Sequence, residues 1–150
     1  MNDENSEFTL YSKLKRLKNY LSIPDLKKGY LYYIFARNSH LGIWLPESNG
    51  FLISRFKYDR NYLFTEYHWD WNDHFGTVKP LKEIEKSPFT VPELDQIRYS
   101  QRSLISDQEY DQSEHVNLSN EYLLKLESSV VKYLNDKAVE YPFLWYNTQL

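Results

Sequence analysis

The sequence contains no cysteine among its 150 residues, only four glycines and no long apolar run. Without cysteine there are no disulfides, thiolate zinc ligands or cysteine nucleophile, and a reducing compartment is favoured, so we expect a cytoplasmic protein. The glycines are well separated, which excludes a glycine-rich phosphate loop. The apolar runs are far shorter than the ~20 residues of a membrane-spanning helix, and the acidic N-terminus is unlike a secretory signal. We therefore expect no membrane span and no export.

Aromatic residues, by contrast, are abundant. They make up 17% of the chain, with 14 Tyr, 8 Phe and 4 Trp, and they concentrate between residues 30 and 75. Large rings fill the cores of β-rich domains and are also enriched on recognition surfaces. Charge is unevenly placed: residues 27–62 carry a net charge of +4 and residues 66–114 a net charge of -6. This pattern indicates a bipolar surface and not a strongly basic one.

The hydrophobic pattern predicts a single α+β domain. Leucines at helical spacing predict an amphipathic helix over residues 8–22, which Pro24 ends. Aromatic and β-branched runs separated by polar turns follow. They predict a five-stranded antiparallel β-meander over residues 30–80, with its last short strand ending before Pro80. Both strand faces carry large apolar groups, so we expect a bent sheet or small barrel, flanked by an N-terminal and a C-terminal helix.

The second half of the chain predicts further helices. Thr90 and Glu93 have capping-box spacing, which predicts a short helix over residues 91–104. Residues 106–116 are acidic with few apolar anchors and are expected to form a mobile loop. An apolar stripe that includes Leu126 and Val130 predicts a helix over residues 119–137. Residues 141–150 form an aromatic tail, docked on the core or across a dimer.

The richest polar cluster lies in residues 66–74. His68, Asp70 and His74 supply nitrogen and oxygen ligands of the kind that zinc or manganese accepts, and Glu66 beside His68 offers an acid/base pair. These residues support a small metal-dependent enzyme as one alternative. The other interpretation is a polar turn at a strand end, whose side chains bond to their own backbone. No nucleophile elbow and no cofactor motif is present, so we expect no cofactor.

A second alternative is binding of RNA or single-stranded nucleic acid. Basic residues interleave with aromatic ones in the early strands, a mixture suited to base stacking and phosphate contact. The candidate residues are Arg37, Arg55, Lys57 and Arg60. Overall acidity counts against this reading, and the same interleaving arises when Arg stems pack on rings across strands.

The favoured hypothesis is a small non-enzymatic module that binds another protein, in the manner of an inhibitor, an immunity protein or a phage or plasmid accessory protein. Exposed aromatic residues would anchor the partner and acidic residues would supply electrostatics around them. The oligomeric state is open, and a dimer is possible. The predicted partner-binding residues are Trp44, Tyr58, Trp69, Trp71, Asp107, Glu109 and Asp111.

Overall fold

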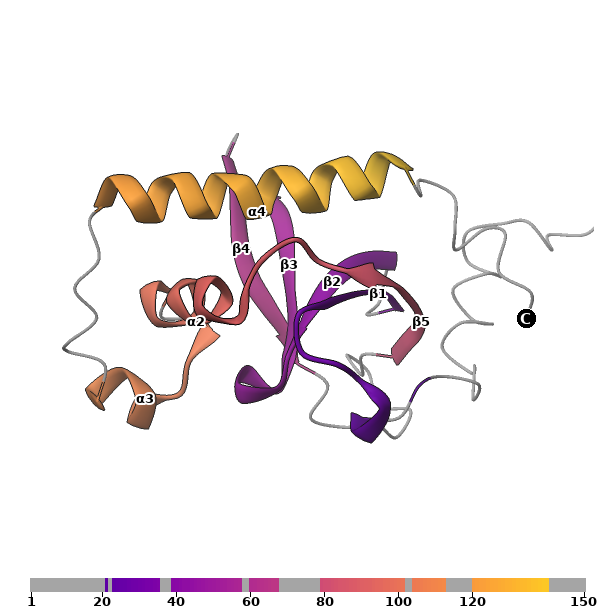
Figure 1. Cartoon of the computed structure of the whole chain (residues 1–150), viewed down its shortest axis with the longest axis horizontal. Coiled ribbons are helices and arrows are strands. Elements are labelled where there is room, and N and C mark those ends of the chain that lie inside the picture. The colour runs from indigo at the N-terminus through magenta and orange to yellow at the C-terminus, as the bar shows by residue number, and fades with distance from the viewer. Residues whose placement is uncertain are drawn as a thin grey trace, which may run out of the picture.

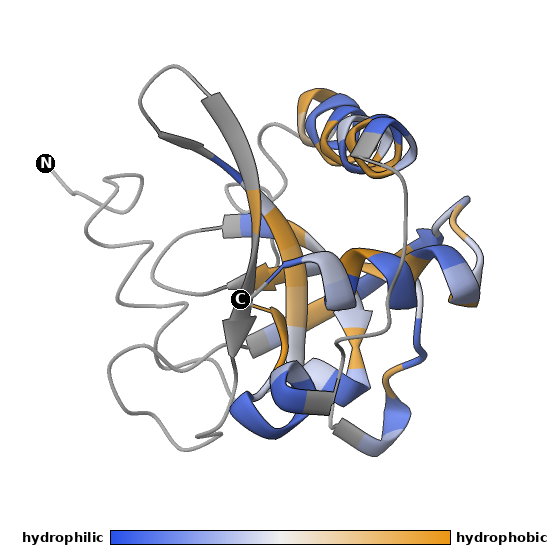
Figure 2. Ribbon diagram, turned by 90° about the vertical axis from the view of Figure 1, so that its left-hand side faces the viewer, coloured by the Kyte–Doolittle hydropathy of each residue, from blue (hydrophilic) through white to orange (hydrophobic). Residues whose placement is uncertain are grey.

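The computed structural model shows a mixed α+β fold, an antiparallel sheet with helices on one side (Figures 1 and 2). It describes residues 21, 23–35, 39–57, 60–67, 79–101, 104–112 and 120–140. The strands are β1 (Tyr30–Phe35), β2 (Ser39–Leu45), β3 (Gly50–Lys57), β4 (Arg60–Tyr67) and β5 (Lys79–Lys86). The α-helices are α2 (Val91–Ser100), α3 (Asp107–Gln112) and α4 (Asn120–Glu140), and the 3-10 turns are η1 (Ile23–Asp25) and η2 (Pro46–Ser48).

Strands β1 to β4 form an antiparallel meander, as the sequence predicts. The β2–β3 hairpin turns through η2, where Asn49 adopts the left-handed conformation that closes such turns. Gly29, just before β1, has a φ of 83° that a side chain would strain, and its amide donates to the Trp44 carbonyl at 3.0 Å. The chain therefore enters the sheet through a glycine that also anchors it to β2.

The fifth strand differs from the prediction of a five-stranded meander. The sheet order is β4-β3-β2-β1-β5, so β5 returns to the far edge and pairs with β1, not β4. It runs through Pro80, where the sequence pattern predicted a strand end. An edge strand tolerates proline because the backbone N–H groups on its outer side have no strand to bond to. The register of the β1–β5 pair also shifts next to Pro80. Within the described residues the sheet is open rather than a closed barrel.

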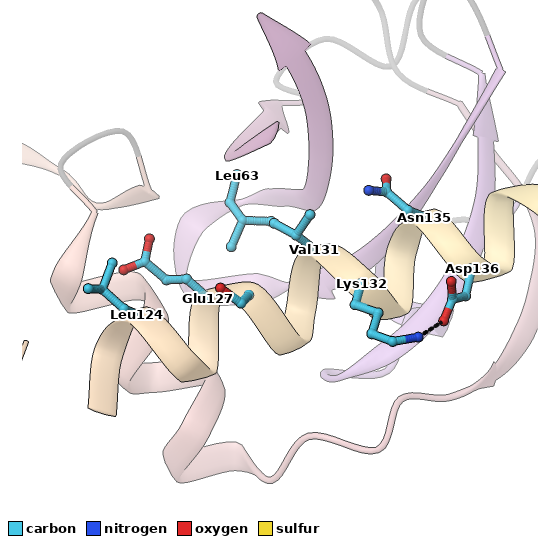
Figure 3. A pocket seen from close by; sticks show the side chains of 8 residues that line it. Leu63, Leu124, Glu127, Val131, Lys132, Asn135 and Asp136 are labelled. Carbon is cyan, nitrogen blue, oxygen red and sulfur yellow. Dashed lines mark hydrogen bonds and ion pairs between the residues drawn. The ribbon is translucent and has the colours of Figure 1, made fainter. Parts of the chain in front are cut away.

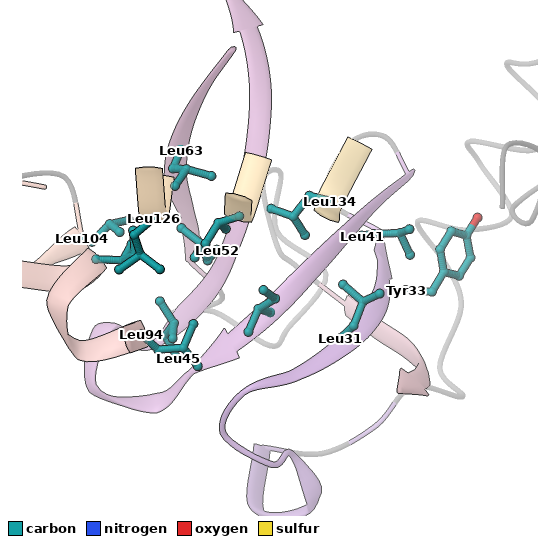
Figure 4. Close-up of a cluster of buried hydrophobic side chains, with 13 residues drawn as sticks. Leu31, Tyr33, Leu41, Leu45, Leu52, Leu63, Leu94, Leu104, Leu126 and Leu134 are labelled. Atoms are coloured by element: carbon teal, nitrogen blue, oxygen red, sulfur yellow. The ribbon is translucent and has the colours of Figure 1, made fainter. Parts of the chain in front are cut away.

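Apolar side chains alternate between the two sheet faces and build two clusters. On one face Leu31, Ile43 and Leu52 pack against α2 and α4 (Figure 4). The helices contribute buried side chains at helical spacing: Leu94, Ile97, Leu126, Val130 and Leu134. On the other face a second cluster contains Tyr32, Ile34, Trp44, Phe51 and Ile53. The expectation that both faces of these strands are buried is thus met at β1, β2 and β3.

Helix α2 begins at the predicted capping box. The Thr90 hydroxyl accepts from the Glu93 amide at 3.2 Å, and the Glu93 carboxylate accepts from the Thr90 amide at 2.8 Å. The helix ends at Ser100 and not at residue 104, because Gln101 turns into extended backbone. Leu104 lies beyond the helix but is fully buried in the core. Helix α4 runs over Asn120–Glu140, where the sequence predicted 119–137.

The predicted mobile loop at 106–116 contains a helix. Helix α3 occupies Asp107–Gln112, and Ser106 caps it, since its hydroxyl accepts from the Glu109 amide at 3.2 Å. The Glu109 carboxylate also bonds to Arg98 of α2. Local capping and one ion pair therefore order residues 107–112, which the acidic composition alone had assigned to a loop. The predicted helix 8–22, except for residue 21, and the tail 141–150 lie outside the described residues.

Candidate functional site

The structure corrects the assignment of Trp44 as a partner-binding residue. Its side chain is 3% exposed and packs against Phe51, with ring centroids 4.9 Å apart. Tyr32 packs edge-on to the same Phe51 ring at 5.9 Å. Burial raises the pKa of the Tyr32 hydroxyl to about 12, although the bond from the Lys27 amide opposes this. These rings are core residues of one sheet face and offer no anchor to a partner.

The three predicted acidic residues sit together on α3, but they differ in their roles. Asp107 and Asp111 are exposed. Glu109 accepts from the Arg98 guanidinium at 2.6 Å, inside the chain. Arg98 is 2% exposed and also donates to the Ser48 hydroxyl at 2.9 Å. Glu109 therefore neutralises a buried cation that joins α2, α3 and the η2 turn.

A second charged group fixes the same region. The Lys28 ammonium pairs with Glu47 at 2.8 Å and with Asp95 at 2.9 Å. Burial opposes its charge, but the hydrogen bonds to these two carboxylates outweigh it and raise the pKa of Lys28. Burial likewise opposes the charge of Glu47, yet the bond from Lys28 lowers the pKa of that carboxyl. These pairs tie the start of β1 to η2 and α2, and their role is structural.

Most of the other predicted site residues cannot be compared with the structure. Tyr58, Trp69, Trp71, Arg37, His68, Asp70 and His74 lie outside the described residues. Lys57 and Arg60 are backbone partners in the register of β3 and β4, and the Arg55 guanidinium lies 3.0 Å from the His40 ring. Among the described residues, no group of three or more His, Asp or Glu side chains could hold a metal ion.

A groove between α4 and β4 is the candidate site that the structure itself presents. Its volume is about 600 Å³, and it runs along one flank of α4 opposite Leu63 of β4 (Figure 3). The apolar part of the lining is Leu63, Leu124 and Val131. The polar part is Glu127, Ser128, Lys132, Asn135 and Asp136. An apolar floor between polar walls is typical of sites that bind another molecule.

The helical repeat explains why these side chains share one flank. Leu124 and Val131 are seven residues apart, which returns them to within about 20° of the same direction and separates them by about 10.5 Å along the axis. Glu127 lies between them. The core residues Leu126 and Val130 point about 100–160° away from Leu124 and Val131, toward the sheet. One flank of α4 therefore faces the groove while its other apolar face holds the helix on the sheet.

The groove carries one carboxylate without a cation. Glu127 accepts a hydrogen bond from the Gln101 amide at 3.0 Å, its one partner among the described residues. Burial raises the pKa of the Glu127 carboxyl, and the bond from Gln101 offsets this only in part. The Lys132 ammonium is already paired with Asp136 at 2.6 Å. The lining thus has a net negative charge, located at Glu127.

Sequence reasoning missed this groove. Seven of its eight lining residues lie on a helix that the sequence did predict. The available signal was the pair Leu124 and Val131, two apolar residues away from the centre of the core stripe, of which Val131 still packs partly against the core. Leu124 is 64% exposed, so its apolar surface is open to a partner. The hollow also depends on the distance between α4 and β4, which no local pattern encodes.

Comparisons with known proteins add no name to this site, because no family model, curated protein or solved structure matches the chain. In the part of the chain that the structure describes, no helix is both long and apolar enough to span a bilayer.

Proposed function

We propose that this chain is a small, non-enzymatic protein-binding module whose groove between α4 and β4 receives part of a partner protein. The observation that carries this proposal is the groove itself: an open hollow with an apolar floor, in which Leu124 remains 64% exposed. Covering such a side chain with a partner removes apolar surface from water, and this stabilises the complex by about 25 cal/mol per Å² of surface covered. The groove takes the place of the buried Trp44 in the proposed contact, while Tyr58, Trp69 and Trp71 stay predicted anchors.

The lining chemistry favours binding over catalysis. Among the eight lining residues there is no histidine, and the charges of Lys132 and Asp136 neutralise each other at 2.6 Å. Ser128 has no histidine beside it in the groove lining to act as a base, and Glu127 is a single carboxylate. An inhibitor, an immunity protein or an accessory protein acts by contact alone and needs no such set. We propose that it does so in the cytoplasm, as the absence of cysteine suggests.

A matched pair of variants tests the proposal. Ser128 lines the groove, whereas its neighbour Ser129 is exposed and lies outside the lining. Ser128→Trp should fill the groove and Ser129→Trp should leave it open, while both place a large ring on the same turn of α4. Wild type and both variants are used, as tagged proteins, in affinity capture from lysate of the native host, with and without nuclease, and the captured proteins are quantified by mass spectrometry.

We expect a stoichiometric, nuclease-resistant partner that Ser129→Trp retains and Ser128→Trp loses. Thermal unfolding of both variants serves as the control for folding. A partner that Ser128→Trp retains at the wild-type level would contradict a role for the groove. A partner that is captured only while nucleic acid is intact would favour the nucleic-acid alternative and the basic residues of β3 and β4.

A further inference from the structure

The sheet face that carries the second cluster is shielded from water, although the described α-helices lie on the other side of the sheet (Figure 2). Five large side chains on this face are each 3% exposed or less: Tyr32, Ile34, Trp44, Phe51 and Ile53. A fully buried side chain touches about 6–12 other residues. Among the described residues outside the strands, Leu21 and Leu26 reach this cluster. Two leucines cannot enclose five large side chains, so a further segment of the chain completes the cover.

The segment that ends at Leu21 reaches this face. Leu21 packs against the second cluster, and its amide donates to the Pro80 carbonyl of β5 at 2.8 Å. Inside an α-helix that amide would bond to the carbonyl four residues before it, so a helix that precedes Leu21 ends before this residue. The chain therefore comes onto this face of the sheet next to the edge strand β5.

The residues before Leu21 carry one apolar stripe. Leu10, Leu14 and Leu17 recur at spacings of four and three, while Lys15 and Arg16 lie on the other side of the helical repeat. Leu10 and Leu17 would be about 10.5 Å apart along a helix. The strands that carry the second cluster, β1 to β3, are neighbours in the sheet and span two strand spacings, about 9.6 Å. The stripe thus has the length that is needed to cross these strands.

We infer that residues 8–20 form an amphipathic helix that docks Leu10, Leu14 and Leu17 on this sheet face. The helix crosses from the β5 edge, where Leu21 is held, toward β3, and Lys15 and Arg16 point away from the sheet. The sheet then lies between two helical layers, and its second cluster is closed to a partner. This inference goes beyond the proposed function and does not depend on it, because the groove lies on the α4 side of the sheet.

Broadening of methyl signals by a nitroxide label tests the inference. The chain has no cysteine, so a single introduced cysteine takes the label. Lys15→Cys places it on the outer side of the inferred helix, and Ser129→Cys, at an exposed position of α4, is the matched control. The full chain carries isotope at its isoleucine methyl groups. Ile34 and Ile53 report on the second cluster, whereas Ile43 and Ile97 report on the cluster under α2 and α4.

With the label at position 15, we expect the Ile34 and Ile53 signals to be weakened more than those of Ile43 and Ile97, because the latter pair lies on the far side of the sheet. With the label at position 129 the order should reverse.

A second pair of variants asks whether the leucine stripe holds the helix in place. Leu14→Glu, added to Lys15→Cys, puts a charge in the middle of the stripe and should remove the broadening of Ile34 and Ile53. Arg16→Glu, added in the same way, changes the outer side of the helix and should leave the broadening unchanged. Thermal unfolding of both variants shows whether each remains folded.

Three results would overturn the inference. The first is stronger broadening of Ile43 and Ile97 than of Ile34 and Ile53 by the label at position 15. The second is broadening of neither pair, which would leave the connection between β4 and β5, residues 68–78, as the cover. The third comes from a sample in which label and isotope are on different copies of the chain: broadening as strong as within one chain would assign the docking to a second copy.

Discussion

The buried ion pair between Arg98 and Glu109 should respond unequally to loss of its two partners. Arg98 is 2% exposed and the Glu109 side chain 28%. Glu109→Ala leaves a buried guanidinium without its anion, and breaking a buried pair in this way costs about 3–5 kcal/mol. Because Glu109 is partly hydrated, we expect the lower limit, about 3 kcal/mol of unfolding free energy. For a chain of this length that is a loss of about 6–12 °C in melting temperature.

The reverse variant should cost less. Arg98→Met removes the buried charge itself, leaves Glu109 where water can reach it, and fills similar volume with an apolar chain. The Ser48 hydroxyl keeps its bond to the Leu104 carbonyl. We expect a loss of about 1–2 kcal/mol. Urea unfolding of both single variants and the double variant gives the comparison, and the double variant should be more stable than Glu109→Ala alone. Equal or smaller destabilisation by Glu109→Ala than by Arg98→Met would refute this reasoning.

Three further predictions concern the sheet and its charged contacts. Trp44→Ala should cost about 3–5 kcal/mol in urea unfolding, because a 3% exposed ring leaves a cavity in the core; a loss near zero would restore Trp44 as a surface residue. Gly42→Ala should cost about 1–3 kcal/mol, because the new Cβ would lie 2.7 Å from the Phe51 Cβ and the two strands must shift; unchanged stability would argue against this β2–β3 packing. Lys28→Met should destabilise the chain at pH 7, and progressively less as the pH falls below about 4.5. The reason is that Lys28 lowers the pKa of the Glu47 carboxyl in the folded chain. This contributes stability that is fully present above 4.5, the ordinary pKa of the group, and is lost as the pH falls through the pKa of Glu47 in the folded chain. A loss that is the same at pH 7 and pH 3.5, measured by urea midpoints, would contradict this contribution.

The meander of β1 to β4 could be predicted because the sequence signals for it lie close together along the chain. Polar residues and apolar runs mark β2 and β3, and only two residues separate the end of β3 from the start of β4. The position of β5 could not be predicted, since pairing with β1 joins residues about 50 positions apart and depends on which sheet edge is free. Pro80 added a misleading signal, because proline ends a central strand but not an edge strand. The existence of β1 to β4 was thus predictable, whereas β5 was not predicted over Lys79–Lys86, and strand order was predictable only where neighbours in sequence pair.

Trp44 and α3 show two different reasons for error. In β2 both faces carry apolar groups, so alternation alone cannot tell whether Trp44 faces the core or a partner. The helix α3, in contrast, had a readable signal: Ser106 and Glu109 have capping-box spacing, the same signal that located α2. Acidic composition was given more weight than this local pattern, and the buried Arg98 that neutralises the segment could not be seen from composition.

Helix α4 explains why a binding groove can exist without weakening the fold. A helix that packs on one core needs a single apolar stripe about 100° wide, and Leu126, Val130 and Leu134 provide it at 6% exposure or less. Leu124 lies roughly 120° from the centre of that stripe, so its apolar surface adds nothing to the core contact. The residues that hold α4 in place and the exposed residue that faces an occupant are therefore different. Changes at Leu124 or Glu127 can then alter binding while the core stripe keeps the chain folded, which is the separation that the groove experiments require.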